Sequence, residues 1–471
     1  METVSPPRHG PRDSRLATAA AGGVWQFFRC PSTGARLEAL SADQWIGSGA
    51  TVAYARTGAV FDFDRPIAPR MEASPKQPPV NADPCPRGID NAPELRAHHD
   101  RAFTRVVEST EEIYGPFDEL PKLTQGAHFR RIEILDALPI RLREDSFAVD
   151  FGVGPWGFAC IFPKLQRARW RVGFDVSVSA LQVSAEKDGS DTGTTAFATS
   201  DGDAIPLVDE CVDVFFGGEV IEHVREPRLF LQEIARVTKD GADVVLTTPN
   251  RDALLYKLDG QSCTIGTEHI ALLSYADLIE RAKRFFEVVS CHGYELTLSP
   301  ELDRLIDDDA TIRELQLRSY DFPALASGLI LHLRTSKALY SANRKCWTRS
   351  EFLWRAGEVT ARGVTRPLPL FGEIEGLLLE PASELTFAIE GDHIILLFWA
   401  HTWSGFARVL VNGIEHLVNL FSKQGGFSRI EIAGNVAGAN EVRISRTDRR
   451  DPRSVADQVI FYKAIGFRRV D

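Results

Sequence analysis

The spacing of hydrophobic positions changes twice along the chain. Between residues 146 and 336, short apolar runs alternate with segments in which apolar residues recur every three or four positions. The runs predict buried strands and the recurring segments predict crossover helices, which together build a mostly parallel sheet. We expect strands at 146–152, 170–177, 195–202, 212–218, 242–249, 286–296 and 327–336, and helices at 95–115, 128–142, 227–241 and 275–286. Gly241 should cap the third of these helices at its C-terminus.

Both flanking regions have patterns typical of β-structure. Residues 25–71 contain short β-like runs between glycine and proline turns, which predict a small β unit. Residues 72–94 are rich in proline and predict a linker, and residues 1–24 are expected to be disordered. Residues 341–471 contain short, evenly spaced strands between Gly, Asn and Asp turns, which predict a β-sandwich or jelly roll. The central α/β unit therefore covers residues 95–340.

Composition narrows the class of protein. The 471 residues include 65 acidic and 54 basic side chains, for a net charge of −11. A negatively charged chain does not attract the phosphate backbone of a nucleic acid, so we do not expect a nucleic-acid partner. Seven scattered cysteines predict reduced thiols and a cytoplasmic location. The apolar stretch 16–28 lacks a cleavage site, and no other run is long enough to span a bilayer, so neither secretion nor a membrane span is expected.

The stretch DFGVGPWGFA, from Asp150 to Ala159, holds three glycines in the spacing G-x-G-x-x-G. A strand, a glycine turn and a helix place backbone N–H groups beside a ligand, and the glycines allow close approach. Pro155 suits the first turn of such a helix. Asp175, at the end of the next strand, can accept hydrogen bonds from a ribose. These features fit either a dinucleotide or S-adenosylmethionine.

A series of blocks decides between the two cofactors. In order and interval, AVDFGVGPWG, VGFDVS, SDGDAIPLVDECVDVFFGGEVIEHV and GADVVLTTPN resemble the class I S-adenosylmethionine-dependent methyltransferases. The resemblance implies a Rossmann-like, seven-stranded sheet with one late antiparallel strand, and S-adenosylmethionine as cofactor. Carried over by position, the cofactor-binding residues are Asp150, Gly152, Gly154, Asp175, Asp203, Ala204 and Gly218. One departure is Trp156, where the family often has a small residue, and Gly157 beside it is left outside the set.

The segment after the fourth strand carries the candidate catalytic residues Glu219 and His223, and His269 follows the fifth strand. A helix starting at Glu219 would place Glu219, Glu222 and His223 on one face. This E-x-x-E-H set with a downstream His is similar to the metal site of ubiquinone-biosynthesis O-methyltransferases and of small-RNA 2′-O-methyltransferases. There a divalent ion such as Mg²⁺ lowers the pKa of the bound hydroxyl. Metal-free relatives carry a similar stretch, so a base, a positioning role and a structural role also stay open, and we assign no metal ligand.

The flanking units bear on the acceptor. FRCPSTGARLEAL with RTGAVFDF is similar to zinc-ribbon-like segments of some bacterial methyltransferases, but Cys30 stands alone, so only the β-scaffold carries over. ILLFWAHTWSGFARVLVNGIEHLVNLF resembles galactose-binding-like jelly rolls. Trp399, Trp403, Tyr462 and His401 could form an aromatic platform for a sugar ring. Alternatively, these rings are the core of a sandwich that packs or self-associates.

Together these patterns predict an S-adenosylmethionine-dependent methyltransferase that acts on an oxygen of a saccharide or glycosylated metabolite. One alternative is a methyltransferase for a lipid, quinone or natural-product hydroxyl. Another is a non-catalytic binding or scaffold protein that keeps only the fold. A homo-oligomer through the C-terminal unit is a further expectation. The three units should fold separately, so residues 95–340 should keep cofactor binding.

Overall fold

The computed structural model describes most of the central and C-terminal units. The described residues are 23–31, 33–39, 44–47, 53–57, 60–67, 122–189, 193–254, 269–296, 308–353, 360–362, 365–371, 374–423, 425–435 and 438–470. The expected linker and the helix expected at 95–115 lie outside them, as do residues 1–22. Within these ranges, no helix is long and apolar enough to cross a membrane.

All seven strands expected in the central unit are present. They are β5 (Phe147–Phe151), β6 (Trp170–Asp175), β7 (Thr195–Thr199), β8 (Val212–Gly218), β9 (Thr238–Pro249), β10 (Phe286–Glu295) and β11 (Gly328–Thr335). They lie side by side in the order β7-β6-β5-β8-β9-β11-β10. The pairs from β7 to β9 are parallel, and β11 runs antiparallel to both of its neighbours. The parallel strands therefore end at one edge of the sheet, the carboxyl edge.

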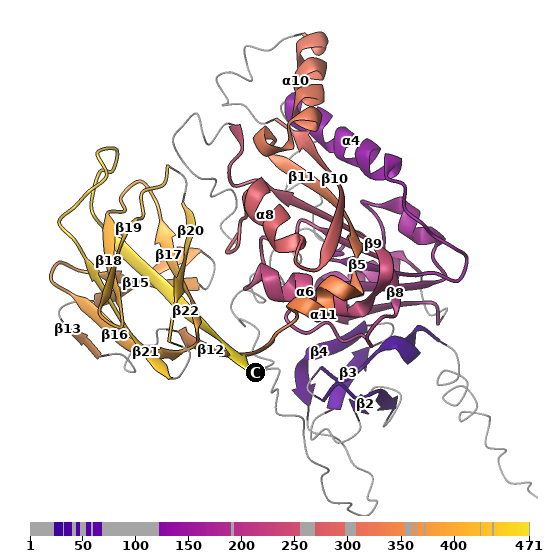
Figure 1. Cartoon of the computed structure of the whole chain (residues 1–471), viewed down its shortest axis with the longest axis horizontal. Helices are drawn as coiled ribbons and strands as arrows, with labels where there is room; N and C mark the ends of the chain where they lie inside the picture. Colours follow the sequence, from indigo (N-terminus) through magenta and orange to yellow (C-terminus); the bar gives the residue numbers. More distant parts are fainter. Residues whose placement is uncertain are drawn as a thin grey trace, which may run out of the picture.

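The sheet has eleven strands where seven were expected. The four additional strands are β1 (Leu37–Ala39), β2 (Gln44–Gly47), β3 (Ala53–Thr57) and β4 (Val60–Ile67), and β4 pairs parallel with β7. Phe28, Phe61 and Phe63 belong to the same hydrophobic cluster as Phe174 of β6. The N-terminal β unit is thus continuous with the central sheet (Figure 1), and β4 occupies what would otherwise be the open edge of β7.

Helices cover both faces of the central sheet. They are α4 (Lys122–Ala137), α5 (Val178–Lys187), α6 (Pro227–Val237), α8 (Tyr275–Ala282), α10 (Asp309–Asp321) and α11 (Lys337–Asn343). Residues of α4 and α5 pack in one cluster with Ala148, and residues of α6 and α8 pack in another with Val149. Neighbouring residues of β5 therefore face opposite helix layers, which explains why every residue of the strand except Asp150 is apolar. The prediction for Gly241 is wrong, because α6 ends at Val237 and Gly241 lies inside β9 with φ +71°.

The C-terminal unit consists of two antiparallel sheets. One contains β14 (Thr365–Phe371), β15 (Ile374–Leu379), β22 (Val459–Val470), β17 (His393–Ala400) and β20 (Gly426–Ala433) in this order, with β12 (Cys346–Leu353) paired to β22. The other contains β13 (Thr360–Arg362), β16 (Glu384–Glu390), β21 (Ala439–Arg446), β18 (Phe406–Val411) and β19 (Ile414–Asn419) in this order. Phe398 of β17 and Val409 of β18 belong to one shared cluster, so the two sheets enclose a common core.

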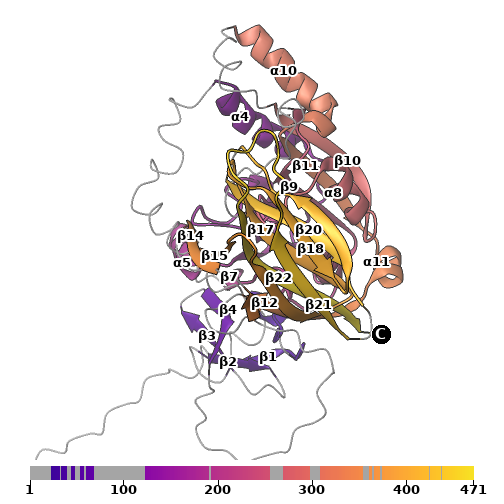
Figure 2. The ribbon, with the colours of Figure 1, turned by 90° about the vertical axis from the view of Figure 1, so that its left-hand side faces the viewer.

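The outer face of the six-stranded sheet packs on the central unit. Trp399, Phe427 and Tyr462 form a cluster with Ile270 and Ala271, which precede α8. Figures 1 and 2 show the C-terminal strands beside the central sheet, on the side of α6 and α8. Trp399 and Tyr462 are therefore excluded from the aromatic platform expected for a sugar ring, because they are only 8% and 5% exposed at this interface. Trp403, which is 55% exposed, lies outside the cluster.

Candidate active site

The glycine loop follows β5 at the carboxyl edge. Gly152 and Gly154 have φ angles of +83° and +56°, in the region that favours glycine. The predicted helix after this loop is absent: the chain continues in turns up to a short 3₁₀ helix, Pro163–Arg167. Gly157 and Ala159 also have positive φ angles, which an α-helix does not allow. Pro155 is therefore not in a first helical turn.

Two buried acids hold this loop in place. Asp150 Oδ2 accepts a hydrogen bond from the Ala159 N–H at 2.8 Å. Asp175 accepts from the Gly154 N–H with one oxygen and from the Ser177 N–H with the other, both at 2.9 Å. Burial raises the pKa of Asp150 to about 7, against a smaller opposing effect of the Ala159 N–H. Both acids thus hold the loop in its conformation through hydrogen bonds within the protein.

Asp203 and Ala204 lie half-buried in the segment after β7. The Arg225 guanidinium donates to Asp203 Oδ2 at 3.0 Å and also to Asp201. Arg225 is itself buried, so this pairing fixes the segment expected beside an adenine. Sequence reasoning missed Arg225, although it follows His223 by only two positions.

The segment from Glu219 to His223 is a turn and not the expected helix. Glu219 has φ 51°, which a side chain rarely adopts and which interrupts a helix. The next helix, α6, begins only at Pro227, with Glu226 as its N-cap. Glu219 therefore turns away from the histidines. Its Oε1 accepts from the Tyr294 hydroxyl at 3.1 Å and lies 3.6 Å from the Arg131 guanidinium.

Glu222, in place of Glu219, joins the two histidines. The ligating atoms of Glu222, His223 and His269 lie within 4.8 Å of one another, and the two imidazole rings are 4.8 Å apart. The Ala271 N–H donates to the Glu222 carbonyl oxygen at 2.9 Å, which anchors the segment carrying His269 beside the turn. The sequence predicted His223 and His269 as residues of one site, and the fold brings them together.

The buried carboxyl group of Glu222 has only part of its hydrogen-bonding capacity satisfied, and its pKa is raised. Thr248 donates to its Oε2 at 2.8 Å, but Oε1 has no hydrogen-bond partner among the described residues. This oxygen lies 3.8 Å from His223 Nε2. Burial raises the pKa of Glu222 well above its usual range, and the charge of Glu219 raises it further. The cluster can therefore hold a proton, or a cation in place of that proton.

Tyr294, Arg131 and Thr248 also border the site, and sequence reasoning missed them. They come from β10, α4 and β9, far from the E-x-x-E-H segment in the chain. No local spacing links them to Glu219 or Glu222, so no short-range signal could have identified them. Gly218, which was predicted, ends β8. A Cβ there would lie 2.8 Å from the Phe216 ring.

Residues 149–246, from β5 into β9, match the family described as "Methyltransferase domain". A methyltransferase from Mycolicibacterium gilvum (strain PYR-GCK), described as uncharacterized, is 28% identical over 148 residues, which cover 31% of this chain and 50% of that protein. Another from Mycobacterium avium (strain 104) is 32% identical over 99 residues, covering 21% and 38%.

These matches span half or less of the length of the two relatives. Among solved structures, an S-adenosylmethionine-dependent methyltransferase from Mesorhizobium loti is similar to 45% of this chain and to 99% of its own. It is 15% identical, with a TM-score of 0.32.

Proposed function

We propose that the protein is an S-adenosylmethionine-dependent methyltransferase that acts on an oxygen of a small-molecule acceptor. The observation that carries the proposal is the match of residues 149–246 to a methyltransferase domain. The glycine loop supports it, because Asp150 and Asp175 hold this loop at the carboxyl edge of the sheet. Ligands of open α/β sheets bind at that edge.

The residues at the carboxyl edge fit the cofactor. A carboxylate offers about four lone-pair positions, so each oxygen of Asp175 can accept from a ribose hydroxyl besides its backbone N–H. Gly152 and Gly154 leave the loop open to the methionine part, and Asp203 with Ala204 flanks the adenine. When bound, S-adenosylmethionine supplies a methyl group that its positive sulfur already activates.

The task left to the chain is to align the acceptor oxygen and to remove its proton. His223 and His269 lie close enough to share this task, one as base and the other as positioning residue. Glu222 then keeps its own proton beside His223 and orients that imidazole. Glu219, held by Tyr294, borders the methyl side of the cofactor.

A second candidate arrangement is a divalent metal ion at the same cluster. The three ligating atoms within 4.8 Å of one another and the unpartnered Glu222 Oε1 favour it. Two imidazoles and one carboxylate suit zinc, manganese or iron better than magnesium. If the ion is required, EDTA abolishes methyl transfer and the missing ion restores it. If activity survives the chelator, His223→Ala or His269→Ala should lower kcat by about 100-fold or more, as loss of a general base does.

The saccharide acceptor is not part of this proposal. It rested on the resemblance of the C-terminal unit to galactose-binding-like jelly rolls, and two rings of the platform expected there, Trp399 and Tyr462, are buried against the central unit. The alternatives of a lipid, quinone or natural-product hydroxyl remain compatible with the site. A scaffold role without catalysis would leave the protein unable to bind the cofactor, which the next experiment tests.

Calorimetry with S-adenosylhomocysteine and NAD tests the proposed function. We expect binding of S-adenosylhomocysteine and none of NAD. Asp175→Ala should weaken binding by about 1.5–3 kcal/mol, the usual range for hydrogen bonds to a charged group. Asp145→Ala is the matched control, because Asp145 is exposed and precedes β5, at the end of the strand opposite the glycine loop. Tight NAD binding, or no binding of either compound, would refute the assignment.

The pH dependence of cofactor binding tests Asp150. Its pKa of about 7 means that the carboxyl group is mostly protonated at pH 6 and mostly ionised at pH 8. The methionine part carries an ammonium group, which the ionised form attracts, so affinity for S-adenosylhomocysteine should rise about tenfold across this interval. Asp150→Asn should remove the rise. An unchanged slope in that variant would assign it to another group.

A further inference from the structure

A cavity lined by charged side chains lies where the C-terminal unit meets α8 and the start of α6. Its volume is about 210 Å³. We refer to it as the α8 cavity. The residues on and directly after α8 that line it are Asp277, Glu280, Arg281 and Arg284. Arg228 of α6, His393 of β17 and Glu431 of β20 also line it.

Arg228 brings an unpaired guanidinium to this cavity. Within the described part of the chain it forms no ion pair, and its side chain donates no hydrogen bond. Its Nε is buried, whereas its two terminal nitrogens are not. The guanidinium lies over the Trp347 ring, with Cζ 4.4 Å from the ring centroid. This contact holds the guanidinium in place and leaves its terminal N–H groups available to a ligand.

The charges around Arg228 favour an anion there. Burial lowers the pKa of Arg228, and the charges of Arg284 and Arg281 lower it further, although Glu226 and Asp392 oppose this. The two other guanidiniums of the cavity are thus close enough to repel that of Arg228. Because arginine stays protonated in proteins, a bound anion relieves the repulsion without any change of protonation.

The three acids that line the cavity are each paired with an arginine other than Arg228. The pairs are Asp277–Arg251 at 2.8 Å, Glu431–Arg429 at 2.9 Å and Glu280–Arg284 at 3.5 Å. These carboxylates repel a second negative charge, so the cavity favours a monoanion over a dianion such as phosphate. The planar fork of a guanidinium matches a carboxylate, which accepts two parallel hydrogen bonds from it.

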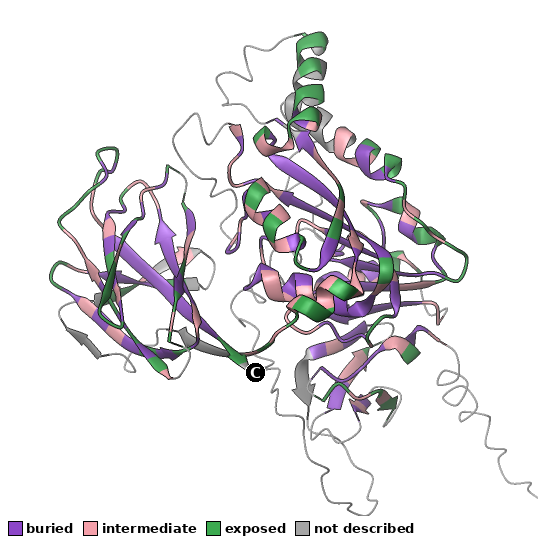
Figure 3. Ribbon diagram, viewed as in Figure 1, coloured by how far each residue is buried: buried purple, intermediate pink, exposed green. Residues whose placement is uncertain are grey.

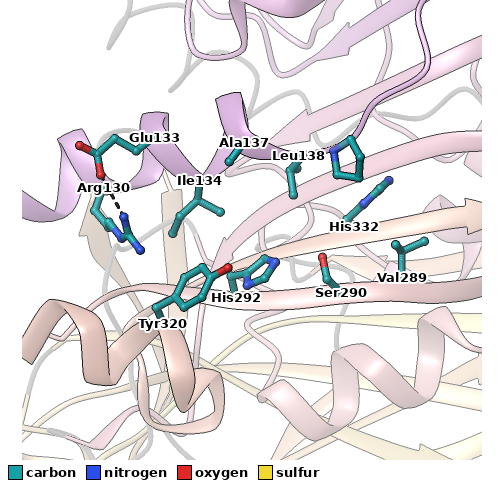
Figure 4. Close-up of a pocket in the computed structure, with 11 residues that line it drawn as sticks. Arg130, Glu133, Ile134, Ala137, Leu138, Val289, Ser290, His292, Tyr320 and His332 are labelled. Atoms are coloured by element: carbon teal, nitrogen blue, oxygen red, sulfur yellow. Dashed lines mark hydrogen bonds and ion pairs between the residues drawn. The ribbon is translucent and has the colours of Figure 1, made fainter.

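Arg130 of α4 offers a comparison within the same molecule. It lines a different cavity, and Figure 4 shows its guanidinium joined to Glu133, at 3.0 Å. This guanidinium also lies over an aromatic ring, with Cζ 5.0 Å from the centroid of Tyr320, and its Nε is also buried without a partner. The two arginines share these features, but Arg130 has a carboxylate partner and Arg228 has none among the described residues.

We propose that the α8 cavity binds a small monocarboxylate, which accepts hydrogen bonds from the terminal nitrogens of Arg228. Arg284 is 45% exposed and pairs only with the 76% exposed Glu280, so it can turn towards the same carboxylate. The acids of the walls accept hydrogen bonds from a hydroxyl group of the ligand, which makes a hydroxy acid a suitable probe. This proposal does not depend on the proposed function.

Ligand-observed NMR titrations of the full chain with lactate and with lactamide, at constant ionic strength, test the proposal without any mutation. The two compounds have nearly the same shape, but only lactate carries a carboxylate. We expect lactate to bind about tenfold more tightly or better, the effect of hydrogen bonds to a charged group. Equal affinities, or no binding of lactate, would refute the site. Binding of phosphate in preference to lactate would refute the ligand class.

Two arginine variants test the role of Arg228. Arg228→Gln keeps a flat polar group beside Trp347 but removes the charge, and it should weaken lactate binding about tenfold. Arg228→Lys keeps the charge without the fork and should restore part of the affinity. Arg130→Gln is the matched control and should bind lactate as the unmodified protein does. Equal affinities in the two glutamine variants would refute the role of Arg228.

A blocking variant tests the location without touching Arg228. Glu280→Trp places a ring at the cavity from an exposed position of α8 and should abolish lactate binding. Loss of the negative charge alone would favour an anion, so weaker binding reports the bulk of the ring. Glu133→Trp on α4 is the control, because Glu133 is 65% exposed and lines the other cavity. Retained lactate binding in Glu280→Trp would refute the location.

Calorimetry with S-adenosylhomocysteine on the same proteins separates the two proposals. Cofactor binding without lactate binding would refute the α8 cavity as a site and leave the methyltransferase proposal intact. Lactate binding without cofactor binding would refute the proposed function and leave the cavity a ligand site. Displacement of lactate by S-adenosylhomocysteine would assign lactate to the cofactor site and refute its binding at Arg228.

Discussion

The two sheets of the C-terminal unit differ in how many of their faces are covered. In β21 of the five-stranded sheet, exposed and buried residues alternate, whereas every residue of β17 after His393 is buried. The same is true of β22 from Val459 to Phe467. Figure 3 shows this contrast as mixed colours on the five-stranded sheet and continuous purple along β17 and β22. One sheet has a solvated face, and the other is covered on both faces along β17 and β22.

Adjacent residues of β17 explain the contrast. Phe398 faces the core between the two sheets, where its ring centroid lies 5.6 Å from that of Phe461. Trp399 faces the central unit and packs edge-on against Phe427 at 5.4 Å. An uninterrupted apolar strand is typical of a sheet buried on both faces. The C-terminal unit is thus packed on the central unit, next to the segment that carries His269.

A buried charge cluster completes this interface. Glu226, the N-cap of α6, accepts from Arg429 of β20 at 2.9 Å and lies 3.2 Å from His393 Nε2. Arg281 of α8 also contacts it, at 3.3 Å. Arg429 donates in addition to the Arg225 carbonyl oxygen. Because the Arg225 side chain binds Asp203, the C-terminal unit supports the residues expected beside the adenine.

Removing residues 341–471 should have the largest effect. It would expose Ile270 and Ala271 and would leave Glu226 without two of its partners. We expect a protein of residues 1–340 to lose cooperative thermal unfolding and at least 90% of its S-adenosylhomocysteine binding, measured by calorimetry. This differs from the sequence-based expectation that residues 95–340 suffice. A truncated protein that unfolds cooperatively and binds the cofactor as the full chain does would show that the covered face is dispensable.

Glu226→Ala should destabilise the protein by about 3 kcal/mol, because the half-buried Arg429 and Arg281 lose their buried carboxylate partner. Glu441→Ala is the control: Glu441 pairs with Arg443 on the exposed face of the five-stranded sheet and should cost less than about 1 kcal/mol. Urea unfolding of both variants measures the difference. Similar losses in the two variants would contradict the contrast between the sheets.

The pH dependence of stability sharpens the Glu226 prediction. Burial alone would raise its pKa, but His393, Arg429 and Arg281 lower it to about 2. A lowered pKa means that the ionised group stabilises the fold above the ordinary value of about 4.5 and loses this effect as the pH falls from 4.5 towards 2. Glu226→Gln should flatten the pH dependence of stability in that interval. A slope equal to that of the unmodified protein would assign acid sensitivity to other carboxylates.

The smallest expected change in stability comes from a comparison of two tryptophans. Trp399→Ala removes a ring from the covered face and should cost about 3–5 kcal/mol. Trp403→Ala removes a ring that is 55% exposed and should change stability by no more than about 0.5 kcal/mol. Thermal unfolding of the two variants measures both values. A large loss from Trp403→Ala would mean that this ring is covered in solution, as in the self-association expected from the sequence.

Local sequence patterns were enough to predict much of the central unit. The apolar runs at 146–152 and 212–218 contain β5 and β8, because a strand that is buried on both faces is mostly apolar; Asp150 and Asp213 are the acidic exceptions. The glycines of the loop were predictable for a similar reason, since positive φ angles at Gly152 and Gly154 require that residue type. Asp150, near the end of β5, and Asp175, at the end of β6, were assigned from their positions in the motif blocks.

Only the tertiary structure decided how these parts combine. The spacing of Glu219, Glu222 and His223 predicted one helix face, but a positive φ at Glu219 sent it to Tyr294 and left Glu222 with the histidines. The pattern of β17 showed two apolar faces and could not show what covers them. Burial against a distant segment such as Ile270 and Ala271 leaves no local periodicity, because its energy depends on surface brought together from far apart in the chain.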